Sequence, residues 1–442
     1  MTRGQPPLGL ACLAAQLRNN GHRVRILDMN VEKIPLAALS AVILDFQPQI
    51  IGFSTTTPLF NTVSRLATHC KKLSKDSLIV VGGPHPSAML EEVLQGTDID
   101  CALKGEGEKS FLRLVENGPS DSIDNLAFRK GGKIAVSSIK EDHVEDLDSL
   151  PFPAYDLLDV RKYGASKLMS RRSPVANMES SRGCFGRCIY CSKKVHGFRV
   201  RMKSPLRVVD ECEYLLSLGF KEIHFIDDIF TANKGRVVAI CEEILRRGLS
   251  FPWYPRGGLR VDTLNKSVLQ MMKRAGCYRI PLGIESGSQR LLDLLQKGIT
   301  LEQAREAVAI TKETGFETEC YFMIGLPTET DEEIRQSIKF AIELDPDYAK
   351  FAITIPLPGT LMFRHWWEEG KIKSKNWDDY TFATPNMVYD HDNLSWDTIQ
   401  HYYQISHRSF YLRAPYLLKM LRNTLKKRTF FYHLKGFFKT QW

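Results

Sequence analysis

Apolar residues in the first part of the chain alternate between two patterns. Residues 7–18 carry leucine and alanine at helical spacing, and an Asn-Asn-Gly turn ends this predicted helix. Short apolar runs, separated by segments long enough for helices, follow at 24–27, 50–53, 78–81 and 101–103. This alternation predicts an α/β fold that begins with a doubly wound parallel sheet.

Three of these predicted strands end in small or polar residues. The turns are Ser54-Thr55-Thr56-Thr57, Gly82-Gly83-Pro84-His85 and Gly105-Glu106-Gly107-Glu108. All three follow the carboxyl ends of strands, which is the edge where open α/β sheets bind ligands. The sequence therefore predicts a ligand site at this edge.

A second series of strands and helices begins near residue 175. Capping boxes pair Thr300 with Gln303 and Thr330 with Glu333, and they predict two of its helix starts. Candidate strands lie at 175–179, 222–226, 253–259, 280–284, 319–324 and 351–355. Six βα units fit a partial barrel, although periodicity alone leaves a second doubly wound sheet open.

We expect four parts in the chain of 442 residues, which is longer than one hydrophobic core usually organises. Residues 1–122 form the first α/β domain, and 123–173 form a connector with a hairpin and a proline-rich segment. Residues 174–375 form the partial barrel, and 376–442 form a basic, aromatic and helical extension.

Composition indicates an ordinary globular protein, with 43% hydrophobic and 25% charged residues. The sequence has no apolar stretch of transmembrane length and no export signal at its start, so we expect a cytoplasmic enzyme. Its ten cysteines are too sparse for a disulfide scaffold. In a reducing compartment, clustered cysteines indicate metal binding or redox chemistry.

Three cysteines lie together just after the first predicted barrel strand. Cys184, Cys188 and Cys191 form a CxxxCxxC pattern in a glycine-containing loop, which can bring their thiolates to one centre. A structural zinc takes four protein ligands, and no second Cys or His pair lies nearby. Soft thiolates fit iron and sulfide, and with three of them one iron of a [4Fe-4S] cube stays open to a small chelating molecule.

This loop at the start of a six-unit barrel resembles the radical S-adenosylmethionine (SAM) superfamily over about residues 175–360. The resemblance implies that the open iron chelates SAM, whose reductive cleavage yields a 5′-deoxyadenosyl radical that takes a hydrogen atom from the substrate. It also implies an external electron donor of the flavodoxin or ferredoxin type. The SAM-binding residues that it implies are Tyr190, Asp227, Asp228, Arg260, Glu285, Ser286 and Gly325.

Each of these residues also has a structural interpretation. The tyrosine would be a core aromatic, the aspartates and the serine would cap helices, and the arginine would be solvated or paired structurally. The glycine would belong to an ordinary strand-to-helix turn.

The first domain resembles the subgroup with an amino-terminal cobalamin-binding domain, which includes methyltransferases and the anaerobic magnesium-protoporphyrin ester cyclase. The likeness rests on Pro-Pro-Leu-Gly-Leu at 6–10, on Gly21-His22 leading to Asp28, on the glycine turns, and on Leu-Pro-Phe-Pro at 150–153. The cobalamin-binding residues that it implies are Ser54, Thr55, Gly82, Gly83, His85, Gly105, Glu106 and Gly107.

The first domain departs from this subgroup in two ways. It has no DxHxxG segment, so we expect no histidine below the cobalt, and His22 and His85 are expected to be turn residues. The inner strand that relatives carry before the Pro-Pro turn is also missing. Either the start of the chain is misassigned or truncated, or the cobalamin site is incomplete.

Residues 398–442 contain nine Lys or Arg, no Asp or Glu, and eleven aromatic residues. A basic aromatic helix can pack over the barrel mouth or lie on an anionic membrane surface. We expect packing for residues 402–418 and membrane-surface contact for residues 418–442. No motif that reads nucleic acid accompanies the charge, so we expect no nucleic-acid partner.

The leading hypothesis is a cobalamin-dependent radical SAM methyltransferase that acts on an unactivated carbon of a small molecule, with lipid-like and tetrapyrrole compounds as candidate substrates. An oxidative cyclase of the magnesium-protoporphyrin type would use the same parts. A tRNA methylthiotransferase would need a second cluster, for which Cys12, Cys70 and Cys101 supply the number. A membrane-peripheral binding protein without turnover is the alternative of another class.

Overall fold

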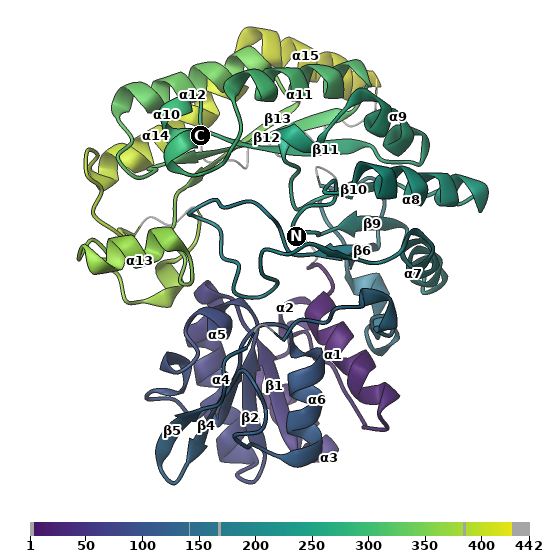
Figure 1. Cartoon of the computed structure of the whole chain (residues 1–442), viewed down its shortest axis with the longest axis vertical. Coiled ribbons are helices and arrows are strands. Elements are labelled where there is room, and N and C mark those ends of the chain that lie inside the picture. The colour runs from purple at the N-terminus through teal and green to yellow at the C-terminus, as the bar shows by residue number, and fades with distance from the viewer. Residues whose placement is uncertain (1–3, 141, 167–168, 383–385, 427–442) are drawn as a thin grey trace.

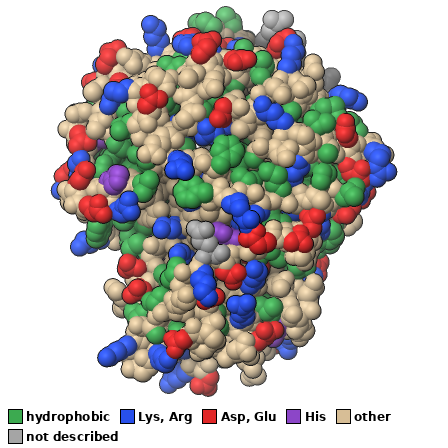
Figure 2. All heavy atoms as spheres, in the orientation of Figure 1, with side chains coloured by type: hydrophobic (Ala, Val, Ile, Leu, Met, Phe, Trp, Pro, Cys, Tyr) green, Lys and Arg blue, Asp and Glu red, His purple; other side chains and the backbone are tan. Residues whose placement is uncertain are grey.

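The computed structural model describes residues 4–140, 142–166, 169–382 and 386–426. Figure 1 shows a smaller α/β body at the bottom of the view and a larger one above it. Figure 2 shows basic, acidic and hydrophobic side chains interspersed over one face of both bodies. No helix in the described ranges is long and apolar enough to cross a membrane.

The smaller body contains a five-stranded sheet whose strands lie in chain order. The strands are β1 (Ile50–Ser54), β2 (Leu78–Gly82), β3 (Cys101–Leu103), β4 (Leu126–Lys130) and β5 (Lys133–Val136). The first three pair in parallel, and the β4–β5 hairpin extends the sheet in antiparallel orientation. The parallel strands and the hairpin of the connector are therefore confirmed.

The strand predicted at 24–27 is wrong, because this segment runs as coil between helices. A strand needs a hydrogen-bonded neighbour, and β1 ends the described sheet on the side where such a neighbour would lie. The apolar side chains instead divide between two cores. Ile26 packs in the core of the larger body, and Leu27 contacts the core of the smaller one.

The helices of the smaller body include one that serves both bodies. They are α1 (Leu8–Asn19), α2 (Met29–Glu32), α3 (Leu36–Phe46), α4 (Phe60–Leu73), α5 (Pro84–Ala88) and α6 (Gly107–Asn117), with short 3-10 turns η1 (Thr57–Leu59) and η2 (Glu92–Leu94). The buried face of α1 belongs to the core of the larger body, where Ala11 and Ala14 share a cluster with Tyr155. The backbone N–H of Ala154 also donates to the carbonyl of Ala11 at 3.0 Å.

The connector runs along this junction as three 3-10 turns, η3 (Leu147–Ser149), η4 (Tyr155–Leu157) and η5 (Val160–Lys162). Tyr155 is fully buried, and its hydroxyl donates to the carbonyl of Asn177 at 2.9 Å. The connector is thus packed against the first strand of the larger body.

The larger body is a partial barrel of six parallel strands. They are β6 (Val175–Met178), β9 (Glu222–Phe225), β10 (Trp253–Pro255), β11 (Arg279–Glu285), β12 (Glu317–Ile324) and β13 (Tyr348–Ile353). They form two three-stranded sheets, which isolated bridges from Trp253 to Cys277 and from Leu259 to Leu282 join into one curved wall. The predicted barrel is confirmed, and the second doubly wound sheet is not found in the described residues.

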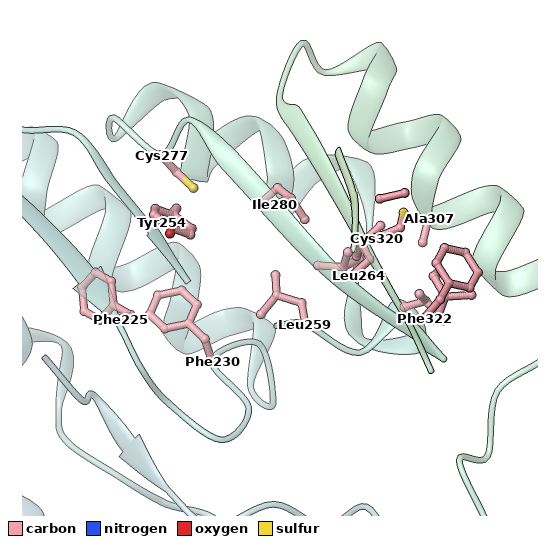
Figure 3. Close-up of a cluster of buried hydrophobic side chains, with 14 of the residues drawn as sticks. Phe225, Phe230, Tyr254, Leu259, Leu264, Cys277, Ile280, Ala307, Cys320 and Phe322 are labelled. Carbon is pink, nitrogen blue, oxygen red and sulfur yellow. The ribbon is translucent and has the colours of Figure 1, made fainter. Parts of the chain in front are cut away.

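Helices cover the outer face of this wall. They are α7 (Pro205–Ser217), α8 (Lys234–Arg246), α9 (Lys266–Arg274), α10 (Gln289–Leu294), α11 (Leu301–Glu313) and α12 (Asp331–Leu344), with the turn η6 (Val261–Thr263). Both predicted capping boxes are present, at Thr300 and Thr330. Figure 3 shows Ile280 and Phe322 from the strands and Ala307 from α11 in the resulting core.

The carboxyl-terminal extension comprises α13 (Leu361–Glu368), η7 (Trp377–Asp379), α14 (Trp396–Tyr411) and α15 (Ala414–Lys426). Tyr402, Phe410 and Tyr416 are buried, which confirms packing of this part. The packing is against the outside of β13, where His407 contacts Phe351, and not over the barrel mouth. Residues 427–442, the end of the predicted membrane segment, lie outside the described residues.

Candidate active site

The three clustered cysteines lie in a loop that a short antiparallel pair closes at its base. β7 (Ser181–Arg182) pairs with β8 (Arg201–Met202). Gly183 follows β7 with φ +87°, and a Cβ there would collide with the carbonyl of Arg199, so only glycine fits. The Gly183 N–H donates to Asp228 Oδ2 at 2.9 Å, which fixes the loop against the end of β9.

The thiols of this loop gather around Gly186. A Cβ on Gly186 would lie 3.4 Å from Cys184 Sγ and 3.8 Å from Cys188 Sγ, and the Gly186 N–H donates to Cys184 Sγ at 3.4 Å. Cys188 is half-buried and Cys191 is exposed. The sulfurs of Cys184 and Cys188 therefore lie beside the space that the absent side chain of Gly186 leaves free.

The donor set of the loop fits an iron–sulfur cube. Within the described residues, no three His, Cys, Asp or Glu side chains are placed to hold one metal ion. In a cube each thiolate binds a different iron, so three cysteines hold three corners without meeting at one ion. Lys193 places a cation near these thiols. Burial lowers the pKa of Lys193, but the charges of the Cys191 and Cys184 thiolates raise it, and the overall shift is upward.

Tyr190 and Glu285 meet in a buried polar triad with Lys297. Lys297 Nζ lies 2.7 Å from Glu285 Oε1 and 3.1 Å from the Tyr190 hydroxyl, which donates to Glu285 Oε1 at 3.1 Å. A Cβ on Gly283 would lie 2.8 Å from Glu285 Oε1 and 3.0 Å from Lys297 Nζ, so this glycine makes room for the ion pair. Lys297 was not predicted from the sequence. The local feature that marks it is a Lys-Gly pair just after α10.

An open pocket of about 440 Å³ is bordered by Lys297 of this triad and by Phe185, Gly186 and Arg187 of the cysteine loop. Its wall includes Phe185, Gly186, Arg260 and Lys297. Arg260 binds Asp262 in bidentate fashion at 3.0 and 2.8 Å and donates to the carbonyl of Lys297 at 2.9 Å. The pocket wall therefore carries three cations, Arg187, Arg260 and Lys297, and one carboxylate, Asp293.

Asp227 and Ser286 are bound within the protein, whereas Asp228 is exposed. The carboxylate of Asp227 accepts from Ser180 N at 2.8 Å and from the hydroxyls of Ser180 and Ser181, both at 2.6 Å. Ser286 Oγ lies 3.2 Å from Ser337 Oγ of α12. The SAM-binding roles of all three residues stay predictions.

Gly325 lies in a tight turn after β12 that a buried carboxylate holds. Glu329 Oε2 accepts from the N–H groups of Gly325 at 2.7 Å and Leu326 at 3.0 Å. Burial raises the pKa of Glu329 to about 8. From the extension, the Tyr389 hydroxyl donates to the carbonyl of Gly325 at 3.0 Å. The sequence pattern did not indicate that this tyrosine, 64 positions away, closes the turn.

The first two turns of the smaller body approach each other closely. Gly83 has φ +100°, and a Cβ there would lie 3.0 Å from the carbonyl of Thr55 and 3.2 Å from Ser54 Oγ. Thr55 is buried, while Ser54 is exposed and Gly82 is partly exposed. Ser54 and Gly82 are therefore more accessible to a ligand at this edge than Thr55.

His85 is buried among aromatic rings. Its ring lies 4.7 Å from Phe60 and 5.0 Å from Trp377 of η7, and Nδ1 lies 3.2 Å from Thr57 Oγ1. Burial lowers the pKa of His85 to about 4, so the side chain is neutral at physiological pH. The position agrees with a packed turn residue, and the predicted contact with cobalamin stays untested.

The third turn lies at the junction between the two bodies. The Gly105 N–H donates to Ser87 Oγ at 2.9 Å, and a Cβ on Gly107 would lie 3.0 Å from Leu13. The Glu106 carboxylate is buried and pairs with Arg201 at 2.5 Å and with Arg182 at 3.3 Å. Both arginines belong to the β7–β8 pair at the base of the cysteine loop.

Two family models match the chain, the radical SAM superfamily over residues 178–341 and the B12 binding domain over residues 4–115. The chain is also 35% identical, over 94% of its length, to an uncharacterized methyltransferase of Pyrococcus horikoshii, of which it covers 89%. This chain belongs to the radical SAM superfamily.

The chain is also similar to two other proteins, one in sequence and one in fold. It is 28% identical, over 87% of its length, to the anaerobic magnesium-protoporphyrin IX monomethyl ester cyclase of Rubrivivax gelatinosus, of which it covers 70%. Its fold is similar to that of the radical SAM methyltransferase TsrM from Kitasatospora setae with cobalamin and [4Fe-4S] cluster bound, with a TM-score of 0.70 at 20% identity over 84% of this chain and 77% of that one.

The predicted family and cofactors are thereby confirmed: this radical SAM enzyme uses a [4Fe-4S] cluster and SAM and carries a cobalamin-binding domain. The arrangement that a methylthiotransferase would need is not found in the described residues. Cys12 contacts the core of the larger body, whereas Cys70 and Cys101 belong to two separate cores of the smaller one. These three thiols do not converge on a second cluster.

Proposed function

We propose that this radical SAM enzyme transfers a methyl group to an unactivated carbon of a small molecule. The observation that carries the proposal is the direct attachment of the cobalamin-binding body to the cysteine loop. Arg182, which precedes the loop, pairs with Glu108 at 2.6 Å and with Glu106, both from the smaller body. Methyl transfer that uses both cofactors requires such a fixed relation between the two bodies.

When bound, the cluster supplies the electron that cleaves SAM, and cobalamin supplies the methyl group. In the proposed site Cys184, Cys188 and Cys191 hold the cluster. Lys297 and Arg260 present cations to the carboxylate of SAM, and Asp228 presents an exposed carboxylate to its ammonium group. Tyr190 holds the buried ends of Glu285 and Lys297 together, so the wall of the pocket keeps its shape.

An oxidative cyclase is the second candidate, because the cyclase relative matches 87% of this chain. Labelled SAM separates the two reactions. The anaerobically reconstituted and reduced enzyme is incubated with methyl-labelled SAM and candidate substrates, including tetrapyrroles and lipids. A methyltransferase places the label in the product, whereas a cyclase forms 5′-deoxyadenosine without a labelled product. A protein without turnover forms neither.

We further propose that the enzyme works in the cytoplasm with an external flavodoxin or ferredoxin. Its ten cysteines are all free thiols, which suits a reducing compartment. The described end of the extension supports membrane contact, since α15 exposes Leu417, Leu418 and Leu421, of which Leu418 is 67% exposed. Sedimentation with anionic vesicles, compared with neutral ones, tests this contact.

A further inference from the structure

The inner and outer faces of the barrel wall differ in chemistry. Along β12 and β13, Phe322 and Phe351 are buried beneath the helices, whereas the alternating residues Tyr321 and Lys350 lie on the other face. Lys350 Nζ lies 5.2 Å from the centre of the Tyr321 ring. The inner face of the barrel is thus lined by polar and charged groups.

Most of the charged groups on this face already have partners. Lys350 pairs with Glu319, and Arg279 pairs with Glu317 at 2.9 Å. Further along the wall, His224 lies 2.8 Å from Glu222, which also accepts from the Tyr278 hydroxyl at 2.7 Å. These pairs leave little charge available to a ligand. The carboxylates in these pairs are Glu222, Glu317 and Glu319.

Arg256 differs from these groups. Its guanidinium makes no hydrogen bond and no ion pair with any described residue, although the side chain is half-buried. Its backbone N–H donates to the carbonyl of Phe225 at 2.7 Å, which places the residue at the carboxyl end of β10. Arg256 lies in the turn directly after β10, two positions beyond Tyr254, whose ring centre is 4.4 Å from that of His224.

The residues after Arg256 bring the chain close to the lumen. A Cβ on Gly257 would lie 2.5 Å from the carbonyl of Asp227, and a Cβ on Gly258, which has φ +87°, would lie 3.2 Å from the Tyr321 ring. Burial raises the pKa of Tyr254 to about 12, and the charges of Arg279 and Arg256 oppose this rise. Burial also raises the pKa of Tyr321, and the charge of Arg256 opposes this rise. Its charge therefore acts on the inner face.

We propose that Arg256 binds an anionic group of the substrate, a carboxylate or a phosphate, inside the barrel. A half-buried guanidinium without a partner has lost part of its hydration, and its planar array of donors matches an oxyanion in bidentate geometry. The inference names the substrate class of the proposed function and rests on it. Arg256 does not line the pocket of Arg260 and Lys297, so it is a separate anion site.

The test is anion binding by the anaerobically reconstituted holoenzyme. Inorganic phosphate and acetate are titrated separately at constant ionic strength, and the thermal midpoint is followed. We expect a saturable rise of the thermal midpoint with at least one of the two anions. The anion that raises it shows whether the site takes a phosphate or a carboxylate. Arg256→Gln weakens this binding roughly 10- to 100-fold, and Arg256→Lys restores part of it. Arg113→Gln, an exposed arginine of α6, is the matched control and binds as the wild type does.

Equal anion binding by Arg256→Gln and the wild type, or no saturable binding by the wild type, would overturn the proposal. SAM affinity is measured in the same variants. It stays within about 2-fold of wild type if Arg256 is separate from the SAM pocket, and a loss comparable to that of the anion contradicts the assignment. Anion binding without any labelled product would contradict methyl transfer but would still support the anion site.

Discussion

Glu285 and Glu106 are both buried glutamates at strand ends, and each pairs with cations. Glu285 pairs with Lys297 on the wall of an open pocket of about 440 Å³. Glu106 lies in the junction between the bodies, where Arg201, Arg182 and His196 surround its carboxylate. Despite burial, the hydrogen bonds from His196 and Arg201 lower the pKa of Glu106 far below its usual value.

Residue type alone therefore does not decide the role of a buried glutamate. The cation that pairs with Glu285 lines an open pocket, whereas the cations that pair with Glu106 hold two bodies together. A cavity of about 10 Å³ beside Glu108 and Arg182 admits no more than a water molecule. Glu106 therefore holds the junction together, and its predicted contact with cobalamin stays a prediction.

The largest effect is expected at the cysteine loop. Cys188→Ala removes one corner of the cluster site, so iron falls from about four to near zero per chain and 5′-deoxyadenosine formation is lost. Iron and sulfide analysis with product chromatography measures both. Cys70→Ala, in α4 of the smaller body, is the control and keeps its iron. Full iron and SAM cleavage in Cys188→Ala would refute the cluster assignment.

The second effect concerns the junction carboxylate. Glu106→Ala leaves the buried Arg201 without its carboxylate partner, while Arg182 keeps Glu108 and Glu179, so we expect a loss of about 3–5 kcal/mol in the free energy of unfolding. Urea denaturation measures it. Asp121→Ala breaks the exposed pair with Lys130 and costs below about 1 kcal/mol. Similar values for the two variants would mean that the junction is not a buried ion-pair network.

The third effect concerns the pocket carboxylate. Lys297→Met removes the partner of Glu285 and one of the three cations on the pocket wall, so SAM binds about 10-fold more weakly while the cluster remains. Equilibrium dialysis with labelled SAM gives the dissociation constant, and iron content serves as the internal check. Unchanged affinity would place the SAM carboxylate elsewhere.

The smallest effect is a pH dependence at Glu329. Its folded-state pKa of about 8 lies above the unfolded value, so the folded state binds more protons between the two values. The stabilisation is complete at acid pH and is lost as the pH rises toward about 8. Between about pH 6 and pH 7 the wild type should lose about 1 kcal/mol more stability than Glu329→Gln. Parallel pH profiles of the two proteins would contradict this.

Local patterns explain which parts of the molecule could be predicted. The cysteine spacing and the capping boxes at Thr300 and Thr330 are encoded within a few residues. The six barrel strands are recognisable as apolar runs. The segment at 24–27 has the same apolar character, but its state depends on a neighbouring strand. Sequence pattern does not carry that information.

Long-range contacts explain the rest. Lys297 reaches Glu285 only because the short helix α10 turns the chain back, and Trp377 reaches His85 across 292 positions of sequence. The junction role of Glu106 likewise depends on arginines from another body. Such contacts follow from the packing of whole elements, so no spacing rule could have shown them.

The position of α1 affects how this enzyme could be recombined with its relatives. By chain order the helix belongs to the amino-terminal module, yet Ala11 and Ala14 are enclosed by the catalytic module. In a chimera spliced within the connector, the α1 helix of another protein would have to pack at a site that fits small side chains. Successful module exchange should therefore move α1 together with the barrel that receives it.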